Sequence, residues 1–286
     1  MKNILVTGAS GFIGSALVVK LESMGLKVFQ LNSSDGDISD INLLKRYNNR
    51  KICHVFHLAS KTFIPESWQN PFDFYRSAVL GTLNILKLCK AKKIPITYVS
   101  AYLYGIPNKL PITETHQLKP NNPYAHSKFF AEDLCKFYSQ FYHVKVTIVR
   151  PFNVYGKGQK KYFLIPSIID QVLCKEVIKV KDIKPKRDYI YLDDFVSGLI
   201  CTLNNKENFS IFNFGSGKGL TVLEIVEIIQ KIAGTNKKLF SEENQRKNEI
   251  MNVVADIQKS KDILNWSPVF KFEDGIREIL KMENKI

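Results

Sequence analysis

The sequence has no apolar run that approaches the roughly 18 residues a membrane-spanning helix needs. Its first apolar stretch, residues 1–6, ends at Thr7-Gly8 and is too short for the apolar region of a secretory signal. The five cysteines are far apart and form no CxxC pair, so neither a disulfide scaffold nor a zinc cluster is indicated. We therefore expect a cytoplasmic protein with no membrane contact and no metal site.

Arginine is also scarce. Only seven of the 41 basic residues are arginine, although the net charge is +14. The cations form no blocks, so the excess lysine is typical of a solvated surface and we expect no nucleic-acid partner. A positive field would help to attract a substrate that carries phosphates. With 45% hydrophobic residues in a chain of 286, disorder is excluded.

Short apolar runs alternate with helical patterns along the first half of the chain. The runs at 3–7, 27–31, 54–58, 96–99 and 144–149 predict strands, and the patterns at 15–24, 71–91 and 127–141 predict helices. This alternation indicates an α/β fold with a Rossmann-type, doubly wound parallel sheet. In such folds, ligands bind at the carboxyl ends of the strands.

Beyond Gly156 the pattern changes. We predict a helix at 166–174, a strand pair near 177–191, and helices at 193–203 and 222–232. The sequence therefore indicates a cofactor-binding Rossmann domain at 1–155, to which part of 187–213 returns. A smaller carboxyl-terminal α/β domain at 156–286 would then bind the substrate. No linker of low complexity separates the two, so we expect them to pack together.

Three glycines, Gly8, Gly11 and Gly14, stand between the first strand and the first helix. Glycines permit a tight turn and let the backbone approach a pyrophosphate, whose charge the amino-terminal end of the helix stabilises. This spacing and placement predict a dinucleotide site. The alternative is a convenient strand-to-helix turn without a ligand.

The second strand of a dinucleotide site normally ends with an acid that accepts hydrogen bonds from the adenosine ribose. Here the corresponding residues are Leu31-Asn32-Ser33-Ser34, and Asp35 follows them. Without an acid at the usual place, NADP(H) is favoured over NAD(H). No arginine is seen there to bind the ribose phosphate, so NAD(H) remains open.

Tyr124 and Lys128 follow a helix-start signature, Pro120-Asn121-Asn122-Pro123, and should stand one helical turn apart on the same face. About 1.4 such pairs are expected by chance, and Tyr47 with Lys51 is a second one. The position favours Tyr124, because it opens the helix that follows the strand ending at Ser100.

The chemistry of hydride transfer explains why these residue types belong together. A phenol exchanges protons poorly at neutral pH unless a neighbouring ammonium stabilises the phenolate, which Lys128 could do. Ser100 could hold the reacting oxygen with a second hydrogen bond. The alternative reading is an amphipathic helix with an incidental surface lysine.

The glycine loop, the segment Tyr124-Ala125-His126-Ser127-Lys128 and several further segments are typical of one protein family. The chain resembles the extended short-chain dehydrogenases/reductases over nearly its whole length, in the branch of NDP-sugar epimerases, dehydratases and reductases. The segments are Gly36-Asp37-Ile38, His57-Leu58-Ala59-Ser60, 99–105 with Ser100 four residues before Tyr104, 150–156, 187–194, Arg246 with Glu249, and 255–268.

This resemblance implies a role for each matching residue. The implied catalytic residues are Ser100, Tyr124 and Lys128. Implied cofactor-binding residues are Gly8, Ser10, Gly11, Phe12, Ile13, Gly14, Asn32, Ser33, Asp37, Ile38, Leu58, Ala59, Ser60, Tyr124, Lys128 and Phe152. Implied substrate-binding residues are Thr62, Ser100, Asn153, Arg187, Arg246 and Glu249, with Asn153 and the arginines at the diphosphate.

Departures from the family pattern narrow the reaction. The 4,6-dehydratases carry an Asp-Glu pair after the catalytic threonine, whereas this chain has Ala101-Tyr102. The missing ribose acid, and Ala78 in place of a common asparagine, favour a reductase that exchanges its coenzyme. The resemblance thus implies an NAD(P)-dependent NDP-4-keto-6-deoxyhexose 4-reductase in cell-surface polysaccharide (O-antigen) biosynthesis.

Two alternatives stay open. One is an NDP-hexose 4-epimerase that retains NAD, and the other is a dinucleotide-binding protein without catalysis. The family also implies a homodimer formed through two helices of each subunit.

Three features imitate functional motifs. Residues 215–219 (Gly-Ser-Gly-Lys-Gly) lack the spacing of a phosphate loop and predict a turn before a helix at Thr221. His54 and His57 should face opposite sides of a strand, and Asp193-Asp194 is typical of a helix start.

Overall fold

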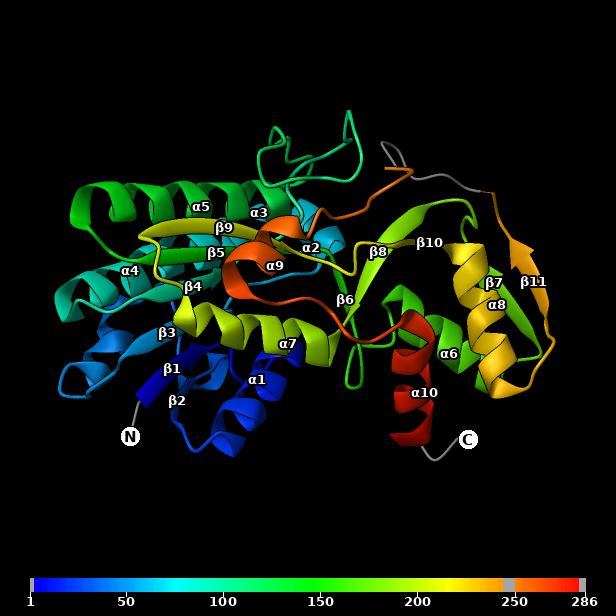
Figure 1. Cartoon of the computed structure of the whole chain (residues 1–286), viewed down its shortest axis with the longest axis horizontal. Helices are drawn as coiled ribbons and strands as arrows, with labels where there is room; N and C mark the ends of the chain where they lie inside the picture. Colours follow the sequence, from blue (N-terminus) through cyan, green and yellow to red (C-terminus); the bar gives the residue numbers. More distant parts are fainter. Residues whose placement is uncertain (1–2, 244–249, 283–286) are drawn as a thin grey trace.

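The computed structural model describes residues 3–243 and 250–282. Six parallel strands form its main sheet in the order β2-β1-β3-β4-β5-β9, which confirms the predicted doubly wound α/β fold (Figure 1). The strand order reverses at β1, so a crevice for ligands is expected between the carboxyl ends of β1 and β3. The strands are β1 (Asn3–Thr7), β2 (Lys27–Leu31), β3 (His54–His57), β4 (Ile96–Val99), β5 (Val146–Pro151) and β9 (Phe209–Phe214).

Helices cover both faces of this sheet (Figure 1). On one face, α4 and α5 bury side chains such as Ile85 and Ala131 against Val55 and Ile96 of the strands. On the other face, α1 and α7 contribute a second apolar core. Because every inner strand is covered twice, its residues read as continuous apolar runs. These helices are α1 (Phe12–Ser23), α4 (Gly81–Lys92), α5 (Pro123–Tyr142) and α7 (Leu192–Cys201).

One predicted helix, 71–91, is divided in the structure. It begins as α3 (Pro71–Tyr75), widens into a π-helical turn at Arg76–Leu80, and continues as α4. A short helix, α2 (Ile64–Gln69), precedes it. The π-helical turn brings Arg76 and Ser77 to the cleft described below.

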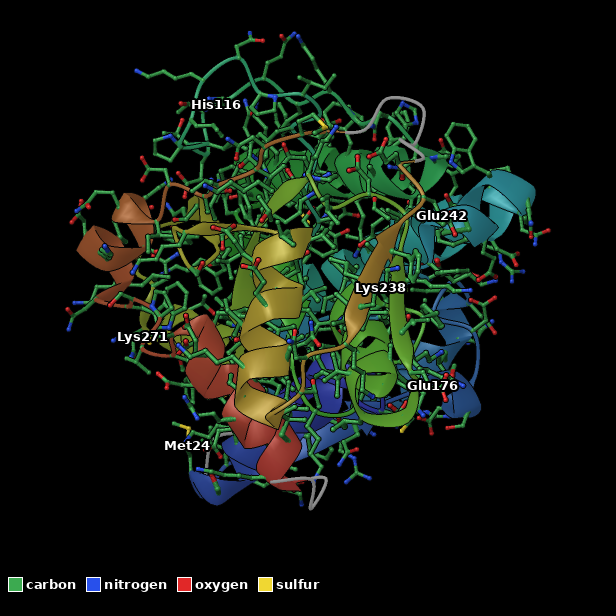
Figure 2. The ribbon with its side chains drawn as sticks, turned by 90° about the vertical axis from the view of Figure 1, so that its right-hand side faces the viewer. Met24, His116, Glu176, Lys238, Glu242 and Lys271 are labelled. Atoms are coloured by element: carbon green, nitrogen blue, oxygen red, sulfur yellow. The ribbon has the colours of Figure 1, made fainter. Side chains whose placement is uncertain are left out.

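A smaller part of the molecule surrounds a third apolar core, formed by α6, α8 and α10 (Figure 2). In Figure 2, α8 lies in front, beside β11, whose first residue is the labelled Lys238. The elements of this part are β6 (Asn153–Tyr155), α6 (Leu164–Cys174), β7 (Val177–Val180), β8 (Lys186–Tyr191), β10 (Gly219–Thr221), α8 (Val222–Ala233), β11 (Lys238–Ser241) and α10 (Phe272–Met282). Helix α9 (Gln258–Leu264) lies instead against β9, and its Leu264 packs in the second core with α1 and α7.

The predicted strand pair near 177–191 is wrong. The two strands exist, but β7 pairs with β11, and β8 pairs with β6 and β10. Residues 181–185 lack the Asn-Gly or Asp-Gly signal of a tight hairpin and end in Pro185, so nothing local holds the two strands together. Partners from distant segments take their place.

The chain returns to the main sheet after β8. Strand β9 pairs with β5 over six residues, and Phe195 of α7 packs in the same core as Leu17 of α1. The division into domains at residue 155, with part of 187–213 returning to the first domain, stays a prediction.

Candidate functional site

A cleft of about 1590 Å³ opens at the carboxyl ends of the main-sheet strands and extends to the smaller part. Every site residue that the sequence predicted within the described ranges lines this cleft, from Gly8 of the glycine loop to Arg187 of β8. Arg246 and Glu249 lie outside the described residues. The sequence therefore selected residues that the fold brings together.

The glycine loop is closely packed. A Cβ atom on Gly14 would lie 2.1 Å from the carbonyl oxygen of Gly8, and one on Gly8 would lie 2.9 Å from the backbone nitrogen of Ala59. Gly8 also has a φ of +69°, which disfavours other residues. Within the described chain, no side chain caps α1 after Gly11, so the positive end of this helix faces the cleft. The loop therefore fits a pyrophosphate.

At the end of β2, the polar groups are already engaged with each other. Asn32 accepts a hydrogen bond from the Ser10 amide (2.6 Å) through its side chain. The Asp35 carboxylate accepts one from the Asn32 amide (2.8 Å) and another from Arg46 (3.1 Å). Asn32 and Ser33, but not Asp35, are among the residues that line the cleft. Asp35 therefore does not take the place of the acid that would accept hydrogen bonds from the adenosine ribose.

Asp37 and Ile38, two of the implied cofactor-binding residues, follow in the chain and also line the cleft. Asp37 accepts from the Ser39 amide (2.9 Å) and pairs with Arg76 (3.1 Å). The Ser39 hydrogen bonds, and to a smaller degree Arg76, lower the pKa of Asp37. Ile38 packs against Gly81, where a Cβ atom would come within 2.7 Å of it. Arg76 is a cleft residue that the sequence analysis missed.

His57 and the loop after β3 are hydrogen-bonded to Thr7, the last residue before the glycine loop. Its ring bonds to the hydroxyls of Thr7 (2.7 Å) and Thr82 (3.1 Å), and Thr7 accepts from the Ala59 amide (3.2 Å). Burial lowers the pKa of His57 to about 3, so the imidazole is neutral. His54 bonds instead to Thr97 on β4, so the two rings contact different groups.

The predicted start of the Tyr124 helix is confirmed. The Asn122 side chain accepts a hydrogen bond from the Ala125 amide (2.9 Å) and caps α5, and Pro123 is the first helical residue. These two residues fix Tyr124 in the first turn. Its ring lies against Phe74, with centroids 6.3 Å apart.

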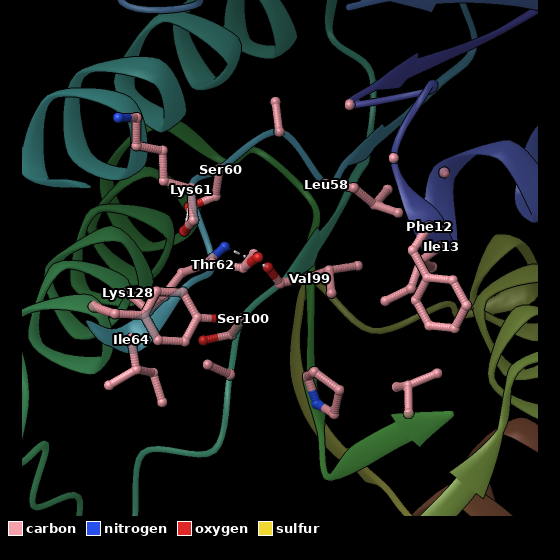
Figure 3. Close-up of a pocket in the computed structure, with 18 of the residues that line it drawn as sticks. Phe12, Ile13, Leu58, Ser60, Lys61, Thr62, Ile64, Val99, Ser100 and Lys128 are labelled. Carbon is pink, nitrogen blue, oxygen red and sulfur yellow. Dashed lines mark hydrogen bonds between the residues drawn. The ribbon is translucent and has the colours of Figure 1, made fainter. Parts of the chain in front are cut away.

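Ser100 and Lys128 lie together opposite Phe12 and Ile13 of α1 (Figure 3). Lys128 donates from Nζ to the carbonyl of Val99 at 2.9 Å, the dashed line in Figure 3. The Ser100 hydroxyl is buried, and it has no hydrogen-bond partner among residues 3–243 and 250–282. An orphaned buried hydroxyl in a cleft is suited to bind a ligand oxygen.

Burial controls the protonation of this cluster. It raises the pKa of Tyr124, and it lowers the pKa of Lys128 to about 8. Burial is the cause of the Tyr124 shift, because an ionised phenol is costly in an enclosed site. The lowering of this pKa that was expected from Lys128 is not seen. Tyr124 therefore carries its proton.

The substrate side of the cleft is lined by side chains from distant segments. Thr62 follows β3, Asn153 begins β6, and Arg187 lies on β8. Asn153 donates to the Asp188 carbonyl (2.8 Å), and Arg187 donates to the Lys186 carbonyl (2.9 Å). Both side chains are held at the cleft.

Several cleft residues were missed by the sequence analysis. Ile64 and Trp68 of α2 and Tyr162 and Phe163 before α6 are apolar residues at the same cleft. The rings of Phe63 and Tyr162 meet at 4.7 Å. Such side chains carry no chemical signal in a sequence, and only their place after β3 and β6 could have pointed to them.

The imitating motifs have the structural roles that were expected. Gly217 has a φ of +75°, and Thr221 caps α8. Asp193 and Asp194 lie in the first turn of α7, where Asp194 also accepts from the amides of Val269 and Phe270. Tyr47, the tyrosine of the other tyrosine-lysine pair, donates its hydroxyl to the Gln30 carbonyl and is not among the residues that line the cleft.

In the described ranges, no helix combines the length and apolarity needed to cross a bilayer, and no three acidic, histidine or cysteine residues gather as metal ligands.

A parallel sheet whose first turn fits a pyrophosphate, with a serine, a tyrosine and a lysine in the same cleft, defines an oxidoreductase that binds a nicotinamide dinucleotide. The chain belongs to the NAD dependent epimerase/dehydratase family, whose sequence pattern matches residues 4–215. It is therefore an enzyme of the extended short-chain dehydrogenase/reductase type, and the resemblance seen in the sequence is confirmed.

The proteins similar to this chain include 4-epimerases and a reductase. A putative UDP-glucose 4-epimerase from Methanocaldococcus jannaschii is 31% identical, with 97% of each chain covered. A GDP-6-deoxy-D-mannose reductase from Pseudomonas aeruginosa is 30% identical, with 98% of this chain and 96% of that protein covered. Among solved structures, RMD from Pseudomonas aeruginosa complexed with NADPH has a TM-score of 0.91 and 29% identity, with 100% of each chain covered.

Proposed function

We propose that this protein reduces the 4-keto group of an NDP-4-keto-6-deoxyhexose to an alcohol, with NADPH as reductant. The bound coenzyme supplies a hydride to carbon 4 of the sugar. Tyr124, which burial keeps protonated, gives its proton to the oxygen of carbon 4. Ser100 donates a second hydrogen bond to that oxygen from its otherwise unpartnered hydroxyl.

Lys128 supports both partners of the reaction. Its ammonium, held near β4 by the Val99 carbonyl, stabilises the phenolate that forms on Tyr124 and binds the coenzyme. Thr62, Asn153 and Arg187 are proposed to hold the sugar and the diphosphate, because they line the other side of the cleft. Arg246 and Glu249 are proposed to complete this contact.

The end of β2 is the observation that carries the choice of a reductase. Its polar residues are Asn32 and Ser33, and the nearby Asp35 is engaged by Arg46 and the Asn32 amide. A neutral site accepts the additional phosphate of NADPH without charge repulsion. The NADPH-bound relative of known structure supports the same choice.

A 4-epimerase with retained NAD is the second candidate. The observation in its favour is the similarity to the putative UDP-glucose 4-epimerase of Methanocaldococcus jannaschii. The same three residues would serve it, because oxidation and reduction at carbon 4 use one proton path.

One experiment separates the candidates. The purified protein is denatured and its released nucleotide is measured; the native protein is then mixed with NADPH and 4-keto-6-deoxy sugars carrying dTDP, UDP, GDP or CDP. We expect little released NAD and rapid NADPH consumption with one nucleotide. Near-stoichiometric NAD, with interconversion of NDP-hexoses and no NADPH consumption, would establish the epimerase instead. Binding of NADPH without activity on any sugar nucleotide favours the non-catalytic alternative.

We propose in addition that the protein is a homodimer formed through α4 and α5. Two aromatic side chains of α5, Phe137 and Phe141, are 47% and 57% exposed, and their rings meet at 4.7 Å. Exposed aromatic clusters of this kind favour protein contacts. Sedimentation should show a dimer, and the double variant Phe137→Asp/Phe141→Asp should sediment as a folded monomer.

A further inference from the structure

Two opposite charges, Lys128 and Glu132, stand one turn apart on α5. Both side chains are buried, with exposed fractions of 2% and 5%. Residues four apart lie on the same helix face, where lysine and glutamate commonly form an ion pair. Here Lys128 donates to the Val99 carbonyl on β4, and the Glu132 carboxylate binds a different cation.

That cation is Arg150, near the end of β5. Its Nε donates to both oxygens of Glu132, at 3.0 and 3.2 Å, and its Nη2 donates to Oε2 at 2.6 Å. Arg150 also donates to the Tyr104 hydroxyl (2.9 Å) and to the Glu114 carbonyl (3.2 Å). A guanidinium fixed from several sides holds the carboxylate in one orientation.

The surroundings of Lys128 contain little charge of their own. Burial lowers the pKa of Lys128 to about 8, while the charge of Glu132 raises it. The buried imidazole of His57 is neutral. Among the described residues, the titratable groups that interact with Lys128 are His57 of β3, Tyr98 of β4, whose ring centroid lies 4.9 Å from Nζ, and Glu132 and Cys135 of α5. Tyr124 stands one turn before Lys128 on the same helix. Glu132 is therefore the negative charge available to keep Lys128 protonated.

We propose that Glu132 and Arg150 are positioning residues for Lys128. The charge of Glu132 keeps the ammonium protonated in its buried site. The fork of Arg150 prevents Glu132 from pairing with that ammonium, which stays available to the coenzyme and to Tyr124. This inference rests on the role of Lys128 in the proposed function.

The test measures NADPH affinity against pH, between about pH 6 and pH 10, by the fluorescence of the bound coenzyme. Affinity should fall on the alkaline side as Lys128 loses its proton, and Lys128→Met should remove this fall. In Glu132→Gln the fall should move about one pH unit toward acid, because the ammonium loses its countercharge. In Arg150→Met it should move toward alkali, because Glu132 is then released to pair with Lys128.

Glu132→Gln and Arg150→Met break the same ion pair, and opposite shifts of the alkaline decrease in NADPH affinity would show that both residues position Lys128. If the ion pair had only a structural role, both variants would bind NADPH more weakly, and the pH of this decrease would not change. Asp133→Asn, at an exposed neighbour on α5, is the matched control and should leave the profile unchanged. If Glu132→Gln fails to fold, the double variant Glu132→Gln/Arg150→Met removes both charges without leaving one unpaired, and it should shift the fall toward acid as well.

Three results would overturn the inference: folded Glu132→Gln or double variants with an unmoved profile, a shift of the same sign in Arg150→Met, or a parent profile that Lys128→Met leaves unchanged. These titrations need no sugar nucleotide. A protein that binds NADPH and reduces no sugar would therefore contradict the proposed reductase, while the shifts would still decide the role of Glu132 and Arg150.

Discussion

The two walls of the cleft differ in whether backbone or side chains form them. The cofactor wall, by which we mean the glycine loop at 8–14, is mainly backbone, and it is packed so closely that Gly14 has no room for a Cβ atom. The substrate wall consists of side chains from distant segments, among them Thr62 after β3, Asn153 of β6 and Arg187 of β8.

This difference bears on how each wall can change. A backbone wall offers no side chain to exchange, so a substitution there disrupts the site as a whole, and the site binds what all dinucleotides share. A side-chain wall can change one residue at a time and can adjust its substrate. We therefore expect substitutions to have large effects at the first wall, and smaller, graded effects at the second.

The largest effect is expected for Gly14→Val. The new Cβ atom would lie 2.1 Å from the Gly8 carbonyl oxygen, so the glycine loop must move. NADPH binding should be abolished, and the free energy of unfolding should fall by about 3 kcal/mol. Calorimetric titration and thermal unfolding measure the two effects.

Gly25→Ala is the matched control for this variant. Gly25 has a φ of +75°, but a Cβ atom there would meet open space. The substitution should cost about 1 kcal/mol of stability through backbone strain alone, with unchanged NADPH affinity. Retained NADPH binding in Gly14→Val would contradict the account of the cofactor wall.

Tyr124→Phe should have the next largest effect, because this residue acts where the two walls meet. Loss of a positioned proton donor should lower kcat by about 10²- to 10⁴-fold, while NADPH affinity changes little. Steady-state kinetics with a 4-keto sugar nucleotide measure this loss. Tyr47→Phe, in the other tyrosine-lysine pair of the sequence, should keep its kcat, and a similar loss in both variants would remove Tyr124 from its role.

The fold could be predicted wherever it follows from local patterns. The glycine spacing, the alternating strands and helices, and the Asn122-Pro123 start of α5 each act within a few residues. The pairing of β7 could not be predicted this way, because its partner β11 begins at Lys238, about 60 residues later. Register between distant strands is set by packing that short windows of sequence do not contain.

The site shows the same limit. Residues with a chemical signal, such as Ser100 and Lys128, were found and lie in the cleft. Arg76 was missed because a π-helical turn, invisible in the helical pattern, brings it there. The rise in the Tyr124 pKa could not be predicted either, because burial depends on the whole fold while the sequence shows only the neighbouring lysine.

Asn32→Asp tests one of the two polar side-chain positions after β2 that are proposed to select the coenzyme. The new carboxylate keeps the acceptor for the Ser10 amide and adds a negative charge beside the place expected for the ribose. The preference for NADPH over NADH should fall about tenfold. Ratios of kcat/KM for the two coenzymes measure the change, and Ser34→Asp, an exposed neighbour, should change the ratio much less. An unchanged ratio in Asn32→Asp would contradict the proposal that the residues after β2 favour NADPH.

Arg187→Met should have an effect no larger than that of Asn32→Asp, because it removes one of several side chains that line the substrate side of the cleft. Arg187 lies on β8 at the cleft. Burial raises the pKa of Tyr102 there, and the charge of Arg187 opposes this rise. If Arg187 binds the diphosphate, its loss should raise KM for the sugar nucleotide about tenfold and leave kcat within about twofold, since the interaction is equal in the ground state and the transition state. Arg277→Met, at an exposed position of α10, is the control and should change neither constant. A decrease in kcat with unchanged KM would instead indicate that Arg187 acts on the reacting groups. It would contradict the assignment of Arg187 to the wall that only binds the substrate.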